Sequence, residues 1–222
     1  MLLADGATVL EVGVGSGRDI GRVHPANVRV VGLEPDPDLA AAARRHTQEE
    51  VHCGTLEALP EAIAEARFQA IALFDVLEHV EDDGYALRLL AERLAPNGRL
   101  VLTVAAYSWM WCQHDEVNHH FRRYSRESLT STLRQAGFRP VTSTYFNFFL
   151  FVAIAAFRIA SRLFRNQGLL PRIKRAGRSD FDVFLGPLDV LFFRVLSLEA
   201  RFLGRVRFPF GVSLFMVAER AG

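Results

Sequence analysis

A glycine-rich turn directly after a short apolar run constrains the fold of this chain more than any other feature. The run Thr8–Val12 is typical of a buried strand, and Gly13, Gly15 and Gly17 follow it. Glycine permits a tight turn, lets a ligand approach the backbone and lets a helix start close by. Glu34 ends the next apolar run, 21 residues after Gly13, where a carboxylate can accept both hydroxyls of a ribose. The pattern therefore predicts a binding site for a nucleotide-like cofactor.

Apolar runs alternate with helical patterns along the chain, which is typical of a parallel sheet with helices on both faces. The runs predict strands over Thr8–Val12, Val28–Leu33, Phe68–Phe74, Gly98–Ala105, Arg139–Tyr145 and Phe210–Glu219. The helical patterns predict helices over Pro37–His46, Leu56–Ala66, Asp82–Leu94 and, from Ser125 to Gly137, a fourth. We expect Ala95–Gly98 to be the turn that precedes the strand beginning at Gly98.

Composition excludes several classes of protein. Half of the 222 residues are hydrophobic and 23% are charged, which is enough apolar material for a sizeable core. Intrinsic disorder and a disulfide-stapled miniprotein are therefore excluded. The two cysteines, Cys53 and Cys112, form no CxxC motif, and no basic segment followed by an apolar one begins the sequence. We expect a reducing compartment, the cytoplasm, and no signal peptide; the net charge of +1 argues against a general nucleic-acid binder.

Charge and phenylalanine are unevenly distributed between the two parts of the sequence. The net charge is −7 through Gly137 and +8 from Phe138 onward, and 15 of the 18 phenylalanines lie in the second part. Such asymmetry favours a membrane surface or an acidic ligand as a partner of the second part. A peripheral contact with the inner face of the membrane is therefore an open alternative.

The Phe-rich part contains two apolar helical stretches, Phe146–Phe164 and Phe181–Phe202, joined by the basic connector Asn166–Arg178. We expect an inserted helical subdomain over residues 146–205 and a cofactor-binding domain over residues 1–145 and 206–222. The uncharged helical portion Tyr145–Phe157 has 13 residues, roughly 20 Å, against about 30 Å of bilayer core. A transmembrane hairpin is therefore disfavoured. Three interpretations of the inserted subdomain stay open: an apolar acceptor pocket, a membrane-interface lid, and a packing or dimer face.

An acidic residue just before the glycine turn bears on the identity of the cofactor. A pyrophosphate prefers a helix N-terminus with no negative charge nearby, and Glu11 lies two residues before Gly13. A carboxylate there repels phosphate and attracts an ammonium group. This favours the zwitterionic S-adenosyl-L-methionine over a dinucleotide. An NAD-dependent oxidoreductase and a non-catalytic, membrane-associated binding module remain the alternatives.

Four segments, in order, resemble the class I S-adenosylmethionine-dependent methyltransferases, in particular their type 11 group. Glu11–Gly17 looks like motif I, and Val31–Pro35 looks like the acidic tip of the strand that follows it. Phe68–Val80 is similar to the fourth-strand motif, and Leu94–Leu100 is similar to the turn before the fifth strand. The resemblance implies a Rossmann-like α/β fold whose seven-stranded sheet has an antiparallel last strand and whose helices cover both faces. It also implies a set of cofactor-binding residues: Glu11, Gly13, Gly15, Gly17, Glu34, Pro35, Thr55, Leu56, Asp75, Val76 and Leu77.

One departure from the family concerns the adenine contact. Family members often carry an aspartate after the third strand, and here Thr55 occupies that place. Backbone groups around Thr55 and Leu56 are the expected substitutes.

Candidate catalytic groups follow the fourth and fifth predicted strands. Asp75, Glu78 and His79 are similar to a pattern that binds a divalent metal in some quinone-biosynthesis O-methyltransferases of the family. A metal-free capping cluster is the favoured reading, and His79 is then a candidate base. No metal is therefore predicted.

The long segment Tyr107–Tyr124 supplies the other candidate bases, His114 and His120. Long ordered loops are usually functional, and the aromatic residues of this one suit a flat or apolar acceptor. The alternative is that Asp115 and Arg123 merely lock the loop in place. The sequence predicts a methyltransferase that acts on an oxygen of a hydrophobic small molecule or lipid-like acceptor.

Overall fold

The fold is described from a computed structural model, which covers residues 4–18, 20, 27–166, 194–195, 198–199, 201–202 and 206–221. Its strands are β1 (Thr8–Val12), β2 (Arg29–Glu34), β3 (Glu50–Cys53), β4 (Phe68–Phe74), β5 (Leu94–Ala105), β6 (Phe138–Phe146) and β7 (Ser213–Arg220). Its helices are α2 (Pro37–His46), α3 (Glu61–Ala64), α4 (Asp83–Arg93), α5 (Gln113–Val117), α6 (Arg126–Gln135) and α7 (Phe151–Asn166), with the short 3-10 helices η1 (Leu77–His79) and η2 (Ser108–Met110).

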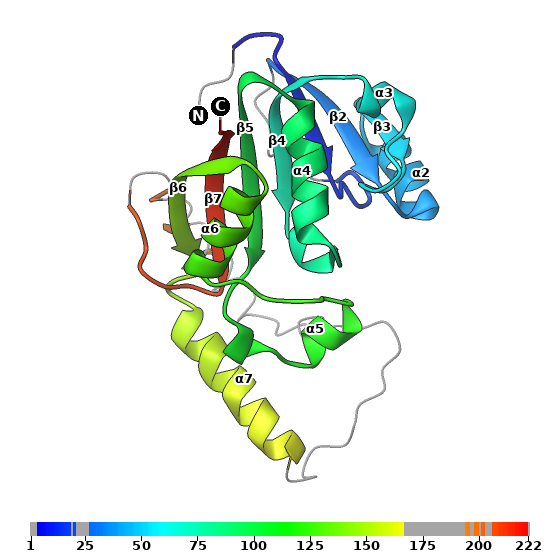
Figure 1. Ribbon diagram of the computed structural model, residues 1–222. Helices are drawn as coiled ribbons and strands as arrows, with labels where there is room; N and C mark the ends of the chain where they lie inside the picture. Colours follow the sequence, from blue (N-terminus) through cyan, green and yellow to red (C-terminus); the bar gives the residue numbers. More distant parts are fainter. Residues whose placement is uncertain are drawn as a thin grey trace. The chain divides into compact units, whose positions relative to one another are not determined.

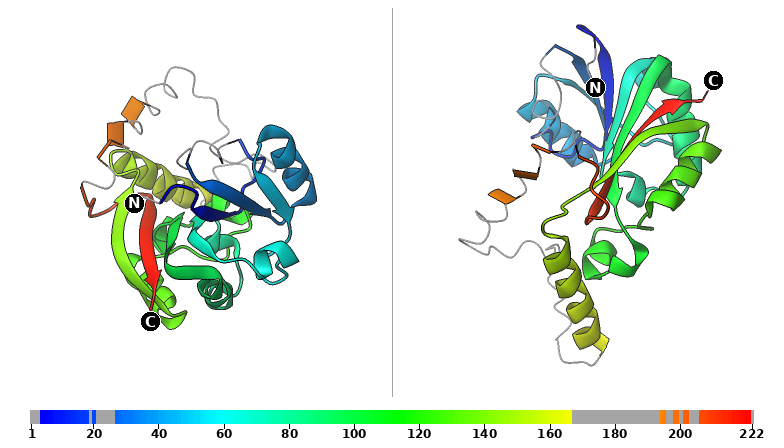
Figure 2. Two further views of the ribbon diagram at one scale, coloured as in Figure 1. Left: turned by 90° about the horizontal axis from the view of Figure 1, so that it is seen from above. Right: turned by 90° about the vertical axis from the view of Figure 1, so that its left-hand side faces the viewer.

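The strands form one seven-stranded sheet in the order β3-β2-β1-β4-β5-β7-β6 (Figure 1). β7, the last strand, runs antiparallel to its neighbours, and in both views of Figure 2 it lies beside β6. This arrangement confirms the predicted Rossmann-like fold, including the third strand, which was expected only from the family resemblance.

The centre of the sheet is parallel, and its register determines which loops meet. β1 pairs with β2 on one side and with β4 on the other, so that Val12 lies opposite Leu33 and Leu73. Val9, Leu10 and Val12 are almost completely buried, as expected for a strand covered on both faces. The carboxyl ends of β1, β2 and β4 therefore lie at one edge of the sheet, where open α/β sheets bind their ligands.

Helix α2 begins and packs as its sequence predicts. Asp36 is its N-cap and accepts hydrogen bonds from the amides of Asp38 and Leu39 at 2.8 and 3.0 Å, with a proline at the first helical position. Ala40 and Ala43 face a core that also contains Val14, Ile20, Val30 and Val51. These small side chains let the helix lie close to the glycine turn.

Two predicted boundaries between α2 and β5 were wrong, for local reasons. The expected helix Leu56–Ala66 is only α3, Glu61–Ala64, because Pro60 disfavours helical geometry in the residue before it. The expected turn at Ala95–Gly98 lies within β5 as an irregularity. The register with β4 jumps there from Leu94 to Arg99.

The chain divides into two compact units. The first comprises residues 1–103, 130–142 and 216–222, and the second residues 104–129 and 143–215. Within the described residues, no helix is long and apolar enough to cross a membrane. Helix α7 begins only at Phe151, so the first predicted helical stretch was wrong at its start, where Tyr145 and Phe146 belong to β6. The connector and most of the stretch Phe181–Phe202 lie outside the described residues, so the proposed subdomain boundaries stay a prediction.

Candidate functional site

The glycine turn after β1 has the backbone geometry that its sequence predicts. Gly13, Gly15 and Gly17 all have positive φ angles, of 75°, 53° and 74°, which other residues rarely adopt. A Cβ atom on Gly13 would lie 2.5 Å from Val76 Cγ2, and one on Gly17 would lie 2.8 Å from Ala43 Cα. A Cβ on Gly15 would meet no atom within 4 Å. Gly13 and Gly17 are therefore needed for packing, whereas Gly15 leaves open space beside the backbone.

The acidic end of β2 is bonded directly to this turn. Glu34 Oε2 accepts a hydrogen bond of 2.7 Å from the Gly15 amide, and Oε1 accepts one of 3.1 Å from the Asp36 amide. Glu34 is only 5% exposed. An ionised carboxylate has about four acceptor positions, so each oxygen keeps one for a further donor. A pair of neighbouring hydroxyl groups, as in a ribose, fits this donor requirement.

The other predicted cofactor-binding residues lie in the same unit. Glu11 is buried on β1, opposite Gly32 of β2. Pro35 is exposed and directly follows β2. Thr55 is exposed and its hydroxyl accepts a hydrogen bond from the Ala58 amide at 3.2 Å, while Leu56 is buried. No contact of Thr55 or Leu56 shows by itself what they bind, so their role remains a prediction.

The segment after β4 is held in an unusual backbone conformation. Asp75 has a φ of 54°, and its amide donates hydrogen bonds to the carbonyl and hydroxyl oxygens of Thr103 at 3.1 and 3.0 Å. The hydroxyl of Thr103 donates in turn to Asp75 Oδ1 at 3.1 Å. Val76 packs over Gly13, and Leu77 is completely buried. Strained conformations that the surrounding structure supports often mark ligand sites.

His79, the first candidate base, is an exposed residue at the end of η1. Glu78 is buried in the same turn. Within the described part of the chain, no three His, Cys, Asp or Glu side chains are grouped so that they could hold a metal ion. The alternative of a divalent metal at Asp75, Glu78 and His79 therefore gains no support from the geometry.

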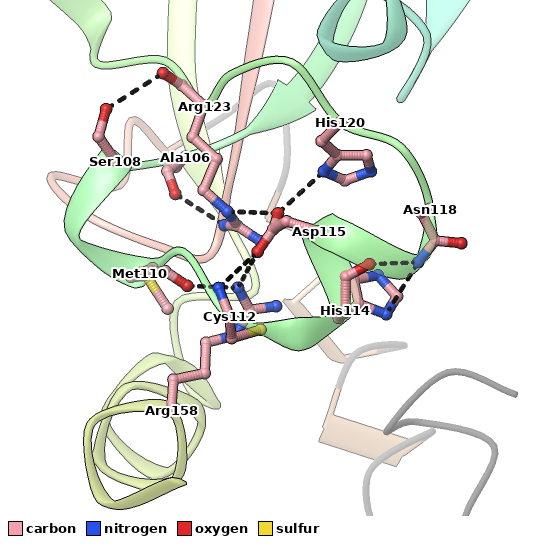
Figure 3. A network of polar contacts seen from close by, with 10 residues as sticks. All are labelled: Ala106, Ser108, Met110, Cys112, His114, Asp115, Asn118, His120, Arg123 and Arg158. Carbon is pink, nitrogen blue, oxygen red and sulfur yellow. Dashed lines mark hydrogen bonds and ion pairs between the residues drawn. The ribbon is translucent and has the colours of Figure 1, made fainter. Parts of the chain in front are cut away.

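The loop after β5, in the second unit, is organised around one buried carboxylate (Figure 3). Asp115 is completely buried, and its oxygens accept from the Cys112 amide at 2.9 Å, His120 Nδ1 at 2.9 Å and Arg123 Nε at 2.7 Å. Burial opposes ionisation of Asp115. The hydrogen bond from His120 and the charge of Arg123 outweigh it and hold the pKa of this carboxyl well below its usual range.

Two arginines connect this network to the rest of the second unit. Arg123 also donates to the carbonyl of Ala106, the residue directly after β5, at 2.9 Å. Arg158 of α7 is 6% exposed, donates to the Met110 carbonyl at 2.9 Å and lies 3.9 Å from Asp115 Oδ2. The contacts of Asp115 and Arg123 thus fix the loop, as the structural alternative predicts, and they fix the two loop histidines with it.

His114 and His120 lie together, with ring centroids 6.0 Å apart and rings nearly perpendicular. Asn118 Nδ2 donates to the His114 carbonyl at 2.7 Å and lies 3.1 Å from His114 Nδ1. Burial, followed by the charge of Arg158, lowers the pKa of His114. The structure thus brings two of the three candidate bases into one network, whereas His79 belongs to the other unit.

Aromatic side chains gather beside this loop in the second unit. Tyr107 stacks on Tyr145 and Trp109 with ring centroids 5.3 and 5.8 Å apart, and Phe151 meets it edge-on at 5.9 Å. Burial, followed by a hydrogen bond with Tyr145, raises the pKa of the Tyr107 phenol far above its usual value. Tyr107 is therefore neutral at physiological pH, and Trp109 remains 47% exposed.

Sequence reasoning missed Arg158 and Asn118. Arg158 is the first charged residue after Arg139 and ends a long uncharged run, and a charge next to such a run is often buried against a partner. That signal indicates a partner without naming it. Asn118 carried no signal of its own, since asparagine is common in loops.

Comparison with known proteins is consistent with this geometry. The model of a family described as "Methyltransferase domain" matches residues 1–143. A ubiquinone biosynthesis O-methyltransferase of Bradyrhizobium diazoefficiens is 30% identical over 109 residues, which is 47% of this chain and 42% of that protein. One from Xylella fastidiosa is 31% identical over 150 residues, 60% of this chain and 61% of that protein. The chain thus spans about two to three fifths of the length of these curated relatives.

Among solved structures, an S-adenosylmethionine-dependent methyltransferase of Mesorhizobium loti matches with a TM-score of 0.62. It is 14% identical in sequence, and the match covers 99% of this chain and 94% of that one. At this level of identity the similarity shows the fold alone.

Proposed function

Since the chain belongs to the methyltransferase domain family, we propose that it transfers a methyl group from S-adenosylmethionine to an oxygen of a hydrophobic small molecule. S-adenosylmethionine is the cofactor that membership of this family implies. The observation that carries the proposal is the bond between Glu34 and the Gly15 amide. It holds a carboxylate, with acceptor positions to spare, beside a glycine with open space next to it.

The residues present fit this cofactor. In the proposal, Glu34 accepts hydrogen bonds from the two ribose hydroxyls, and Glu11 attracts the ammonium group of the methionine part. Asp75–Leu77 lie beside the methionine part, and Thr55 and Leu56 beside the adenine. Open space next to Gly15 lets the ligand approach the backbone. When bound, S-adenosylmethionine supplies a methyl group on a positively charged sulfur, which leaves as a neutral thioether.

Pro35 completes the proposed ribose side of the site. It follows Glu34 directly and fixes the chain between β2 and α2, whose N-cap is Asp36. Because proline has a restricted φ angle, it limits the freedom of the acidic strand tip. The Glu34 carboxylate itself is held by the Gly15 and Asp36 amides.

The acceptor class is proposed from two observations. The matched relatives are named as ubiquinone biosynthesis O-methyltransferases, and the second unit presents stacked aromatic side chains, among them the partly exposed Trp109. Flat apolar molecules stack favourably on such side chains. A phenol or catechol with an apolar substituent fits both observations.

An oxygen acceptor must lose a proton during the transfer, and the protein has to take it up. General bases in enzymes contribute typically 10²- to 10⁴-fold to the rate. His79, His114 and His120 are the candidates, and a neutral imidazole at physiological pH suits the task.

A methyl-transfer assay tests the proposed function. The purified chain is incubated with S-adenosylmethionine and a panel of prenylated catechols, unsubstituted catechol and polar hydroxy acids, and S-adenosylhomocysteine formation is measured. We expect turnover with the apolar catechols, little with the polar acids, and none without an acceptor. Turnover confined to nitrogen or carbon acceptors would contradict O-methylation, and no turnover with any acceptor would favour a binding module.

We also propose a peripheral contact between the basic second part of the chain and an anionic lipid surface. Its support is the net charge of +8 from residue 138 onward and the exposed apolar residues Phe149, Val152 and Ile159 at and within α7. Anionic headgroups attract such basic, apolar segments. Flotation with phosphatidylglycerol-containing vesicles at low salt is the test. We expect the chain to be recovered with the anionic vesicles and not with neutral vesicles. Its absence from the anionic lipid fraction would refute the contact.

A further inference from the structure

The last turn of α2 is hydrogen-bonded to the glycine turn that follows β1. His46 Nδ1 lies 2.9 Å from the carbonyl oxygen of Ser16, the residue between Gly15 and Gly17. Because a carbonyl oxygen only accepts hydrogen bonds, His46 Nδ1 must carry a proton. An imidazole has a hydrogen on Nδ1 both in this neutral tautomer and in the cation. The bond is therefore compatible with either charge state of the ring.

The packing of α2 against the glycine turn brings these two groups together. Ala43 of α2 is completely buried, and a Cβ on Gly17 would lie 2.8 Å from its Cα, so helix and turn are in contact there. His46 follows Ala43 by three residues and therefore lies on the same face of the helix. His46 is itself exposed, so it contributes a hydrogen bond to the turn, and little buried area.

Two side chains thus hold neighbouring residues of the turn. Glu34 at the end of β2 accepts a hydrogen bond of 2.7 Å from the Gly15 amide, and His46 at the end of α2 donates to the Ser16 carbonyl. The segment between Gly13 and Gly17 has three glycines in five residues, and glycine has the greatest conformational freedom of all residues. A turn that is ordered before its ligand arrives avoids the cost of ordering it on binding.

We infer that His46 is a positioning residue of the cofactor site, whose Nδ1–H group holds the Ser16 carbonyl and so keeps the glycine turn in the form that the cofactor approaches. The inference rests on the proposed function, in which S-adenosylmethionine binds beside Gly15. His46 acts through the backbone of the turn and not on the reacting atoms. All of these groups lie in the first compact unit.

Nuclear magnetic resonance of the ¹⁵N-labelled full chain at pH 8 tests the hydrogen bond without any ligand. Long-range ¹H–¹⁵N spectra identify the protonated nitrogen of a neutral histidine ring, and the His46→Gln variant assigns the signals. We expect His46 to be mainly in the Nδ1–H form. A ring mainly in the Nε2–H form, or an equal mixture of the two, would overturn the inference, because a bare Nδ1 cannot donate to the Ser16 carbonyl.

Three variants of His46 separate the donor from the other properties of the ring. Asparagine carries its amide nitrogen on Cγ, where histidine carries Nδ1, whereas glutamine carries it one atom further from the backbone. We expect His46→Ala and His46→Gln to weaken S-adenosylhomocysteine binding roughly 3- to 10-fold, the effect of losing one hydrogen bond, and His46→Asn to bind like the wild type. Titration calorimetry measures the affinities. Binding by the alanine variant within twofold of the wild type, or equal losses in the asparagine and alanine variants, would overturn the inference.

Arg44→Met is the matched control for a general loosening of α2. Arg44 Nε donates to the Val51 carbonyl at 2.8 Å, so it ties the same end of α2 to β3 and not to the glycine turn. We expect a Tm loss similar to that of His46→Ala and an unaltered affinity for S-adenosylhomocysteine.

The outcomes distinguish this inference from the proposed function. An equal loss of affinity in Arg44→Met and His46→Ala would show that the stability of α2 matters and not the position of the Ser16 carbonyl, which would overturn the role of His46 while the cofactor assignment stands. If the wild-type chain binds no S-adenosylhomocysteine, the cofactor assignment and the role of His46 fall together, whereas the tautomer measurement still reports on the hydrogen bond.

Discussion

Glu34 Oε2 lies 2.7 Å from the Gly15 amide nitrogen, so the acidic end of β2 is hydrogen-bonded to a turn 19 residues earlier in the chain. The parallel pairing of β1 and β2 brings the two together, since the register places Val12 opposite Leu33. The bond explains how a carboxylate can remain 5% exposed and still be held ready for ligand hydroxyls. It joins the two sequence features from which the cofactor was predicted.

Removing the Glu34 carboxylate is expected to weaken cofactor binding. Hydrogen bonds to charged groups are worth about 1.5–3 kcal/mol, so Glu34→Ala should weaken S-adenosylhomocysteine binding roughly 10- to 100-fold. Titration calorimetry measures the change. The control is Glu92→Gln, which alters an exposed glutamate near the end of α4 and should leave the affinity unaltered. Equal affinity in the Glu34 variant and the wild type would remove the ribose assignment.

Two alanine substitutions in the glycine turn should have different consequences. Gly15→Ala places a Cβ where no protein atom lies within 4 Å, so only the left-handed backbone costs stability, about 1–2 kcal/mol. We expect a folded protein with sharply reduced cofactor affinity. Gly17→Ala also places a Cβ 2.8 Å from Ala43 Cα, which adds about 1–3 kcal/mol of overpacking.

Thermal unfolding and calorimetry on the same samples distinguish these two effects. The Gly17 variant should have the lower Tm, and the Gly15 variant should combine a smaller loss of Tm with weak binding. Normal cofactor affinity in a folded Gly15→Ala protein would show that no ligand approaches this glycine.

Replacing Arg158 should destabilise the second unit. The guanidinium donates to the Met110 carbonyl at 2.9 Å, and the side chain is 6% exposed. Arg158→Met leaves that carbonyl without its donor, which costs about 1–3 kcal/mol. Arg139→Met is the matched control. The Arg139 side chain is 72% exposed in its ion pair with Glu219. Such exposed pairs contribute at most about 1 kcal/mol to stability. Similar Tm values for the two variants would contradict this account of α7.

Stability should depend on pH through His114. Burial and the charge of Arg158 lower its folded-state pKa below the unfolded value of about 6.5. The unfolded chain therefore binds more protons as the pH falls below 6.5, and the stability that the neutral ring contributes is lost. We expect the Tm advantage of the wild type over His114→Gln to shrink between pH 8 and pH 5.5. If the Tm advantage grew on acidification, the pKa of His114 would be raised in the folded state, which would contradict this prediction.

Features set by local sequence and by strand order were predictable. Gly13, Gly15 and Gly17 adopt the positive φ angles that a turn requires, and the parallel order of β1 and β2 brings Glu34 to them. The loop was predicted only as a cluster of candidates. Its interactions depend on Arg158, which follows Met110 by 48 residues. A contact between residues so far apart in the chain leaves no periodic pattern in the sequence that could predict it.

The predicted element boundaries were wrong where proline and glycine are compatible with either a turn or an irregular strand. Ala95–Gly98 has the composition of a turn, yet the backbone remains part of β5, with Asn97 at a φ of 62°. A Cβ on Gly98 would lie 3.0 Å from the Phe68 carbonyl oxygen, so this glycine is needed where β4 and β5 approach closely. Sequence alone identifies the irregularity and leaves open whether pairing continues through it.

Side-by-side titration of the wild-type chain with S-adenosylhomocysteine and with NADH tests the central claim most directly. If the Glu34–Gly15 arrangement holds a sulfur-bearing nucleoside, one equivalent of S-adenosylhomocysteine binds and NADH gives no saturable heat. Binding of NADH together with a flat titration for S-adenosylhomocysteine would contradict the account.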